Sequence, residues 1–300
     1  MELREFTPTV GKSLLLPHKE IVLCPLGDIQ LGAPGCKIDR LKKHIKWAEG
    51  LRAKGAEVYY VGMGDYVDVA SPSNRKILKK AFVDLYDSAK LMFDDAAERL
   101  LGELQKVLAP TKGHWIGLLS GHHLYEFEDG TNTDTRLAQF LETTYLGDSA
   151  MVHLRFGKTG STSGATAKLW LHHGQGGGQT ISAALNKIMQ RAVPYWMANL
   201  YMIGHYHTKQ AIPIPWIDSY VTRDGDVKLT GTTRYLVCTG GWLAGYEEGT
   251  HDGAKVAKGN YIEKAMLSPH TLGAPVIFIR PVRERKDGRS TTRIDINVSV

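Results

Sequence analysis

The chain has 300 residues, a formal net charge of +6 and 43% hydrophobic residues, an ordinary composition for a folded domain with a large core. Its three cysteines are widely spaced and form no Cys-x-x-Cys pair, which excludes a disulfide framework and favours a reducing compartment. Residues 1–19 hold only a short apolar patch broken by Pro17, and no run is long enough to span a bilayer, so we expect a cytoplasmic protein without a membrane partner.

Apolar runs of strand length recur along the chain, and each ends at glycine or a polar residue. The first five are EIVLCPLGD (20–28), EVYYVGMGD (57–65), HWIGLLSGHH (114–123), AKLWLHHG (167–174) and NLYMIGHYH (199–207). Three more follow, at RYLVCTGG (234–241), PVIFIRPV (275–282) and RIDINVSV (293–300). The sequence therefore predicts at least these eight strands.

Amphipathic helical patterns separate the early strands. One apolar stripe consists of Ile38, Leu41, Ile45 and Ala48. A longer pattern over 74–108 has Ser71 or Ser73 as its expected N-cap and Pro110 as its stop, and a third covers 179–197. Alternating strands and helices predict an α/β layered fold, and the run of strands after about residue 208 predicts a second sheet packed on the first. We expect one domain over residues 1–300.

Polar side chains follow each of the first five strands. The endings are Gly27-Asp28-Ile29-Gln30, Gly64-Asp65 with Asp68, Gly121-His122-His123, His172-His173-Gly174 and Gly204-His205-Tyr206-His207. The carboxyl ends of strands in such folds converge on one crevice, and imidazole and carboxylate groups gathered there form metal sites. Each ending alone is better explained by a turn or by a histidine bonded to a backbone carbonyl. Five in order favour a metal site.

The series GDIQ, GDYVD, GHH, HHG and GHYH, from Asp28 to His207, resembles the motifs D-x-H, G-D-x-x, G-N-H, H-G and G-H-x-H of the calcineurin-like metallophosphoesterase superfamily. The resemblance implies a four-layer α/β/β/α sandwich of two packed mixed sheets with a dinuclear metal centre. Two positions depart from the family pattern. Gln30 stands where the family has histidine, and His122 stands where it has asparagine.

Carried over by motif, the resemblance implies two metal sites that share a bridging Asp65. Site one comprises Asp28, Gln30, Asp65 and His207, and site two comprises Asp65, His122, His173 and His205. We expect two divalent ions, with Mn²⁺ favoured because it accepts both oxygen and imidazole ligands, and Zn²⁺, Fe or Mg²⁺ as alternatives. Because a neutral amide oxygen is a weak ligand, site one is expected to be the weaker site.

The chemistry implied by the resemblance is hydrolysis of a phosphate ester by a hydroxide that bridges the two metals. His123 matches the family's non-ligand histidine, which steadies the phosphate and protonates the leaving oxygen. Asp68 matches the carboxylate that orients this histidine, although a helix N-cap is an equal alternative for Asp68. Strand alternation allows only one of His172 and His173 to face the site, and His173 precedes the glycine as in the family.

Substrate class is indicated by the residues around the motifs. GDYVD resembles the phosphoprotein phosphatases, but Val69-Ala70 stand where those enzymes have Arg-Gly, and Ser120 stands where they have an arginine. GDIQLG resembles the DIHLG of double-strand-break repair nucleases. These features favour a phosphodiesterase acting on nucleic acid or a nucleotide. A phosphomonoesterase of small molecules or proteins and a degenerate, non-catalytic metal-binding protein remain alternatives, and the sequence leaves the oligomeric state open.

Three other segments each have two interpretations. The basic stretch 280–293 is either a phosphate-backbone contact or a solvated hairpin. The loop GQGGGQT (174–180) either cradles phosphate with backbone N–H groups or forms a rim. The third set is three aromatic residues that either stack on a base or belong to the core: Trp242, Tyr246 and Tyr261.

Overall fold

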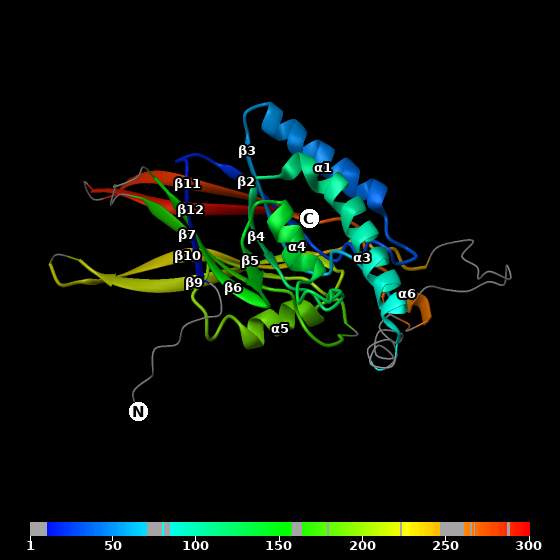
Figure 1. Cartoon of the computed structure of the whole chain (residues 1–300). Helices are drawn as coiled ribbons and strands as arrows, with labels where there is room; N and C mark the ends of the chain where they lie inside the picture. The colour runs from blue at the N-terminus through cyan, green and yellow to red at the C-terminus, as the bar shows by residue number, and fades with distance from the viewer. Residues whose placement is uncertain are drawn as a thin grey trace.

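The structure is a computed structural model, and the residues that it describes are 11–70, 80, 85–157, 164–178, 180–222, 224–246, 261–264, 266, 268–286 and 289–300. Their strands form two six-stranded mixed sheets (Figure 1). The β2 sheet has the order β12 (Arg289–Ser299), β11 (Val276–Lys286), β2 (Ile21–Leu26), β3 (Glu57–Gly62), β4 (Trp115–Leu119), β5 (Tyr145–Gly147). The β7 sheet has the order β1 (Gly11–Leu16), β6 (Ser149–Phe156), β7 (Ala165–His172), β8 (Leu200–Ile203), β10 (Val227–Thr239), β9 (Lys209–Val221).

Helices cover the outer faces of both sheets (Figure 1). Those on the β2 sheet are α1 (Ile38–Ala53), α3 (Asp87–Leu108) and α4 (Thr133–Phe140), and α5 (Ala183–Arg191) lies on the β7 sheet. A short 3₁₀ turn, Ala109–Thr111, follows α3, and α6 is a single turn, Tyr261–Lys264. No helix in the described ranges is both long enough and apolar enough to cross a bilayer.

Three apolar layers hold these elements together. One layer packs α1, α3 and α4 on the β2 sheet, a second joins the two sheets, and a third packs α5 on the β7 sheet. Side chains alternate between the two faces of strand β2. Val22 and Cys24 face the helices, Leu23 faces the other sheet, and all three are buried. Burial on both faces explains why the strand is continuously apolar. The expected four-layer α/β/β/α sandwich is therefore confirmed.

The prediction that strands after residue 208 build the second sheet is wrong in detail. Strands β6, β7 and β8 already belong to the β7 sheet, because β8 pairs with β7 and β10 rather than with β4. Strands β11 and β12 return to the β2 sheet, where Ile277 pairs with Leu23. The apolar pattern is the same in strands of either sheet. It therefore predicts where the strands lie in the sequence but not which strands pair with each other.

All eight predicted strands are present, but the sequence analysis missed β1, β5, β6, β9 and the helix α4. Leu41, Ile45 and Ala48 line the buried face of α1 as predicted. The long helix is described from Asp87 onward, so the expected caps Ser71 and Ser73 lie outside the described residues. Pro110 lies in the 3₁₀ turn directly after this helix.

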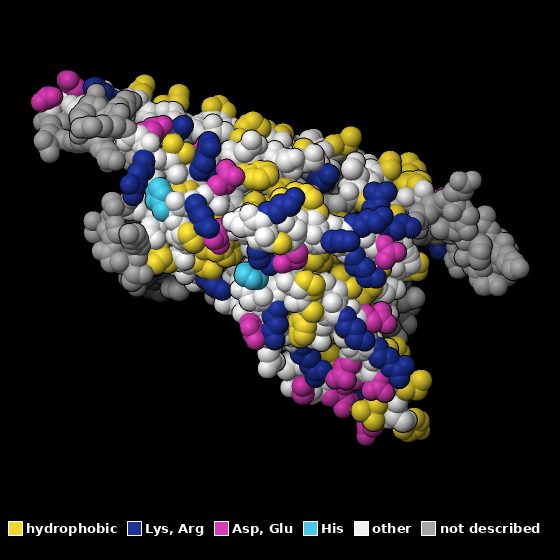
Figure 2. All heavy atoms as spheres, turned by 90° about the horizontal axis from the view of Figure 1, so that it is seen from above, with side chains coloured by type: hydrophobic (Ala, Val, Ile, Leu, Met, Phe, Trp, Pro, Cys, Tyr) yellow, Lys and Arg dark blue, Asp and Glu magenta, His cyan; other side chains and the backbone are white. Residues whose placement is uncertain are grey.

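The charged side chains of the helix-covered side are mixed in sign. Figure 2 shows Lys and Arg interspersed with Asp and Glu on the face seen from above. Several of these charges are paired locally on α1, as between Lys42 and Asp39 at 3.3 Å. The net charge of +6 is thus not concentrated into one positive field on this face.

Candidate metal centre

The carboxyl ends of β2, β3 and β4 in one sheet meet those of β7 and β8 in the other. Hydrogen bonds from backbone N–H groups join the loops that follow them. The Asp28 N–H donates to the Gly64 carbonyl at 2.9 Å, and the His205 N–H donates to Oδ2 of Asp28 at 2.8 Å. Strand ends from both sheets therefore hold one common site between the layers.

Four predicted ligands form a tight group at this junction. Asp65, His122, His173 and His205 each offer one ligand atom, and these four atoms all lie within 4.8 Å of one another. They are the residues expected for site two. Nδ1 of His122 lies 3.4 Å from Nδ1 of His205, and Nε2 of His173 lies 3.3 Å from Oδ2 of Asp65. Three imidazoles and a carboxylate at these distances suit a divalent transition metal.

Asp65 and His173 each use one polar side-chain atom in hydrogen bonds that fix the side chain. The second polar atom of each side chain remains available to bind a metal. Oδ1 of Asp65 accepts from the backbone N–H groups of His122 and His123 at 2.5 and 2.9 Å. Nδ1 of His173 lies 2.6 Å from the Met63 carbonyl, so this nitrogen carries the proton and Nε2 faces the site. Histidine ligands in proteins are typically oriented by such a bond from the second ring nitrogen.

The atoms left available are buried and lack hydrogen-bond partners. They are Oδ1 of Asp28, Oε1 of Gln30, Oδ2 of Asp65 and Nε2 of His173. Asp28 and Asp65 are each at most 1% exposed. A buried polar atom without a partner is costly, and a cation bound beside Oδ2 of Asp65 and Nε2 of His173, which lie 3.3 Å apart, would satisfy both. The side chains present therefore fit the expected metal ions.

Site one is less compact than site two. Nε2 of His207 lies 3.6 Å from Oδ1 of Asp28 and 3.5 Å from Nε2 of Gln30. Gln30 is 1% exposed, so its amide faces the site rather than solvent. Turning the Gln30 amide by 180° exchanges its oxygen and nitrogen and leaves the carbon atoms in place. In that orientation Oε1 faces His207. The structure thus brings Asp28, Gln30 and His207 together beside Asp65.

The backbone at these positions is strained. Eight described residues other than glycine have positive φ, and five of them belong to the predicted ligand set: Asp28 (48°), Gln30 (49°), Asp65 (55°), His205 (69°) and His207 (55°). Left-handed conformations cost an L-residue about 1–2 kcal/mol each. Strain of this kind concentrates where side chains are held for function.

Burial and mutual charge set the protonation of the metal-free centre. Burial raises the pKa of Asp28, and the neighbouring Asp65 carboxylate adds to this effect. Burial opposes the charged form of His173, but the Asp65 carboxylate outweighs it and raises the pKa of His173 to about 9. Burial together with the charge of His173 lowers the pKa of His205 to about 4. Without a cation, protons on Asp28 and His173 neutralise the carboxylates.

His123 lies beside the ligand group but outside it. Its Nε2 is 3.6 Å from Oδ2 of Asp65, and its Nδ1 is 2.9 Å from Oδ2 of Asp68. The other oxygen of Asp68 accepts from the Ala70 N–H at 3.2 Å. Asp68 therefore contacts His123 as the resemblance implied, while the N-cap alternative concerns residues 71–79, which lie outside the described part of the chain.

His172 points away from the centre, as strand alternation predicts. Its Nδ1 accepts from the Gly174 N–H at 2.7 Å, and its ring stacks on Trp170 with 5.6 Å between centroids. Only His173 of this pair reaches the site.

Sequence reasoning missed three supporting groups. Oδ2 of buried Asp134, at the start of α4, accepts from the Gly121 N–H at 3.0 Å, and burial raises the pKa of Asp134 to about 7. The ring of His270 stacks on His207 with 5.9 Å between centroids. The Met63 carbonyl orients His173. Only Asp134 had a signal, because Asn132 caps α4 through a capping box that the sequence TNTDT encodes.

The structure decides between the two interpretations for some of the three remaining segments. In the stretch 280–293, Arg280 pairs with Asp295 at 2.8 Å and Arg293 with Glu284 at 2.6 Å, which supports the solvated hairpin. Trp242 is 2% exposed and belongs to the core. The Gly176 carbonyl lies 3.2 Å from Nε2 of His205, so residues 174–178 of the glycine-rich loop border the site.

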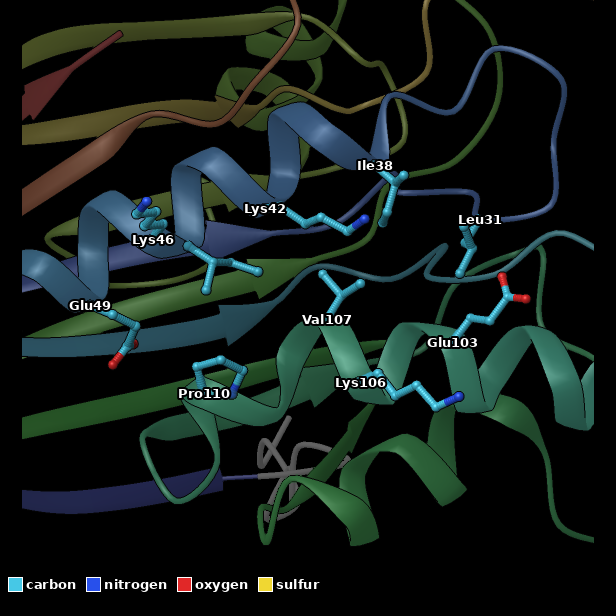
Figure 3. A pocket seen from close by; sticks show the side chains of 10 residues that line it. Leu31, Ile38, Lys42, Lys46, Glu49, Glu103, Lys106, Val107 and Pro110 are labelled. Atoms are coloured by element: carbon cyan, nitrogen blue, oxygen red, sulfur yellow. The ribbon is translucent and has the colours of Figure 1, made fainter.

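A separate groove runs between α1 and α3 (Figure 3). It has a volume of about 680 Å³, and its lining includes Ile38, Lys42, Lys106 and Val107. None of its lining residues belongs to the predicted ligand set, although Leu31 at one end directly follows Gln30. The groove is therefore distinct from the metal centre.

Comparison with known proteins found similar chains among solved structures only. No protein-family model matches the chain, and no curated protein matches it. Among solved structures, that of Vps29 from Chaetomium thermophilum is similar with a TM-score of 0.31 and 8% sequence identity, covering 93% of this chain and 96% of that chain. A likeness of this degree says nothing about activity. The chain itself has the four-layer sandwich and the Asp/His cluster that its motif series implies for a calcineurin-like metallophosphoesterase fold.

Proposed function

We propose that the protein is a metal-dependent phosphoesterase that cleaves phosphodiesters in nucleic acid or in a nucleotide. The observation that carries this proposal is the place of His123. Its imidazole lies 3.6 Å from the central Asp65 carboxylate and 2.9 Å from Asp68, yet it stands outside the group formed by Asp65 and the three ligand histidines. A metal-storage site needs no such histidine, whereas a hydrolase needs a proton donor beside its metals.

Two ions would be held by site one (Asp28, Gln30, Asp65, His207) and site two (Asp65, His122, His173, His205), and Mn²⁺ suits both ligand sets. When bound, such ions supply positive charge for the phosphoryl oxygens and lower the pKa of a water molecule. The His122 and His123 N–H groups hold Oδ1 of Asp65 in place, which supports its proposed role as the shared ligand.

The chain's own acid–base chemistry centres on His123. Oδ2 of Asp68 lies 2.9 Å from Nδ1 of the ring, and Nε2 lies on the side of the centre, 3.6 Å from Oδ2 of Asp65. From there His123 donates its proton to the oxygen of the leaving alcohol. The 7% exposure of Asp68 and 6% exposure of His123 keep water from competing for these bonds.

A phosphodiester is favoured over a monoester because of charge. Near neutral pH a diester carries one negative charge and a monoester carries close to two. The phosphoprotein phosphatases have arginines among the residues that correspond to Val69, Ala70 and Ser120. These three residues are neutral here, so they provide no positive charge to balance the second negative charge of a monoester. The smaller charge of a diester suits such a site.

The test is hydrolysis of bis-p-nitrophenyl phosphate beside p-nitrophenyl phosphate, with Mn²⁺, Zn²⁺, Mg²⁺ or Fe²⁺ added to chelator-stripped protein. We expect the diester to be the better substrate and Mn²⁺ the best activator. Preference for the monoester would show a phosphomonoesterase instead. Stoichiometric metal binding without turnover of either ester would favour the non-catalytic alternative, which Gln30 and His122 motivate as departures from the family pattern.

A further inference from the structure

A glycine-rich loop, residues 174–178, follows β7 and borders site two. Four of its five residues are glycine, and Gly174 and Gly176 have positive φ values of 111° and 71°. Glycine loses more backbone freedom on ordering than any other residue, so a loop of this composition keeps one conformation only where other groups hold it. The contacts that hold this loop lead to one lysine on α5.

Two side chains donate to the same carbonyl of the loop. Nζ of Lys187 donates to the Gln175 carbonyl at 2.5 Å, and the Tyr206 hydroxyl donates to it at 2.8 Å. A carbonyl oxygen has two lone pairs and can accept both bonds. The Lys187 ammonium also lies 5.3 Å from the centroid of the Tyr206 ring. These contacts fix the Gln175 carbonyl, and with it the start of the next peptide unit.

The next carbonyl in the loop orients a predicted metal ligand. The Gly176 carbonyl lies 3.2 Å from Nε2 of His205. Because a carbonyl only accepts, Nε2 is the protonated nitrogen of this pair, and the neutral ring then carries its lone pair on Nδ1. Nδ1 of His205 lies 3.4 Å from Nδ1 of His122, which belongs to the same ligand group. The loop therefore presents the metal-binding nitrogen of His205 to site two.

Lys187 reaches this loop from a rigid element. Helix α5 lies on the outer face of the β7 sheet (Figure 1), and its Leu185 and Ile188 are buried against that sheet. Lys187 lies between these two anchors in the sequence. Its Nζ would be 3.2 Å from a Cβ added at Gly176, so the ammonium group lies close to two successive residues of the loop. A functional side chain is held most firmly when its support comes from a packed helix or strand.

We propose that Lys187 is a positioning residue for site two. It holds the 174–178 loop so that the Gly176 carbonyl fixes His205 for metal binding. The inference rests on the metal centre of the proposed function. Partners that orient a ligand histidine typically contribute 10–100-fold to metal affinity, and Lys187 acts one contact further out, so we expect about tenfold.

The direction of the effect separates positioning from simple electrostatics. The charge of Lys187 repels a cation bound at site two, so a lysine that acted only through its charge would weaken metal binding, and its removal would tighten it. A lysine that positions His205 gives the opposite result, because its removal frees the loop and with it the orientation of the ligand ring.

The test is titration of chelator-stripped protein with Co²⁺, followed by the visible absorption band that reports the coordination of the ion. We expect Lys187→Met to weaken the tighter of the two sites about tenfold and to alter its band. Lys187→Arg keeps a charged donor and should recover most of the affinity. The matched control is Arg191→Met, which removes the same charge from the next turn of α5 and should not weaken binding.

Tyr206→Phe removes the second donor to Gln175 without changing the charge, and it should weaken the same site. Wild-type or tighter affinity in Lys187→Met would overturn the proposal, and so would equal weakening by Arg191→Met. Failure of the wild-type protein to bind Co²⁺ would overturn the metal centre and this role together. Binding of two ions without hydrolysis of either ester would contradict the phosphoesterase activity alone, while the affinities still decide the role of Lys187. The melting temperature in chelator, which should match that of wild type, checks the folding of each variant.

Discussion

Nδ1 of His123 lies 2.9 Å from Oδ2 of Asp68, while Nε2 of the same ring lies 3.6 Å from Oδ2 of Asp65. One imidazole thus stands between the carboxylate at the centre of the ligand set and a carboxylate outside it. Removing the ring removes no predicted ligand atom, so the proposed acid catalysis can be tested separately from metal binding by substitution at this position.

His123→Ala should lower turnover about 10²–10⁴-fold on an ester with an alcohol leaving group, while leaving metal content unchanged. The loss should be much smaller on a p-nitrophenyl ester, because p-nitrophenolate leaves readily without a proton. Turnover of a dinucleotide and of bis-p-nitrophenyl phosphate at saturating Mn²⁺ gives the comparison. Equal losses on both substrates would mean that His123 binds phosphate instead, and loss of metal would make His123 a ligand.

Gln30→His should tighten metal binding at site one. The buried amide lies 3.5 Å from Nε2 of His207, so an imidazole there would face the same ion, and imidazole binds these metals better than a neutral amide does. Chelator titration followed by metal analysis should show two-stage loss in wild type and a later first stage in the variant. An unchanged first stage would show that residue 30 is not a ligand.

Much of the site was predictable because its chemistry is encoded locally. Glycine and a polar residue after each strand fixed the positions of Asp28, Asp65, His173 and His205, and the topology of strand ends brought them together. The orientation of His173 over His172 also followed from alternation.

What the sequence could not show depends on long-range contacts. Strand β11 joins β2 although more than 250 residues separate them, and nothing in its apolar pattern names that neighbour. His270 reaches His207 only because Gly273 and Gly241 exchange two backbone hydrogen bonds, of 2.9 and 3.1 Å. Asp134 reaches Gly121 only through the placement of α4, a helix too short for its periodicity to stand out.

Metal binding should release protons between pH 6 and 8. In the metal-free protein the pKa of His173 is about 9, because Asp65 outweighs the effect of burial, and burial raises the pKa of Asp28. A metal must displace these protons, so its apparent affinity should fall as the pH falls below about 9. His205, with a pKa of about 4, is already neutral and should release none.

Calorimetry of Mn²⁺ binding in buffers of different ionisation enthalpy measures the number of protons released. We expect at least one per chain at pH 7, and a slope of log affinity against pH of the same size. Zero release across this range would contradict the protonated His173 of the metal-free centre. His173→Ala provides the matched measurement, since it should lower both the affinity and the proton count.

Gly241→Ala should empty site one while sparing site two. A Cβ at this position would lie 2.9 Å from Cβ of Asp28 and 3.1 Å from Nδ1 of His207, which is too close for either side chain to stay in place. The backbone cannot retreat, because Gly241 is tied to Gly273 by two hydrogen bonds. Overpacking of this kind typically costs about 1–3 kcal/mol of stability.

The variant should therefore bind about one ion per chain instead of two and melt at a lower temperature, as measured by metal analysis and calorimetry. The control is Gly102→Ala in α3, where nothing lies within 4 Å of the added Cβ. Alanine there should keep both ions and raise stability by about 0.5–1 kcal/mol, since glycine is unfavourable inside a helix. If Gly241→Ala keeps two ions at wild-type affinity, Asp28 and His207 do not hold a metal. If Gly241→Ala loses both ions, the two sites are not independent, because site two then cannot hold its ion through Asp65 once site one is empty.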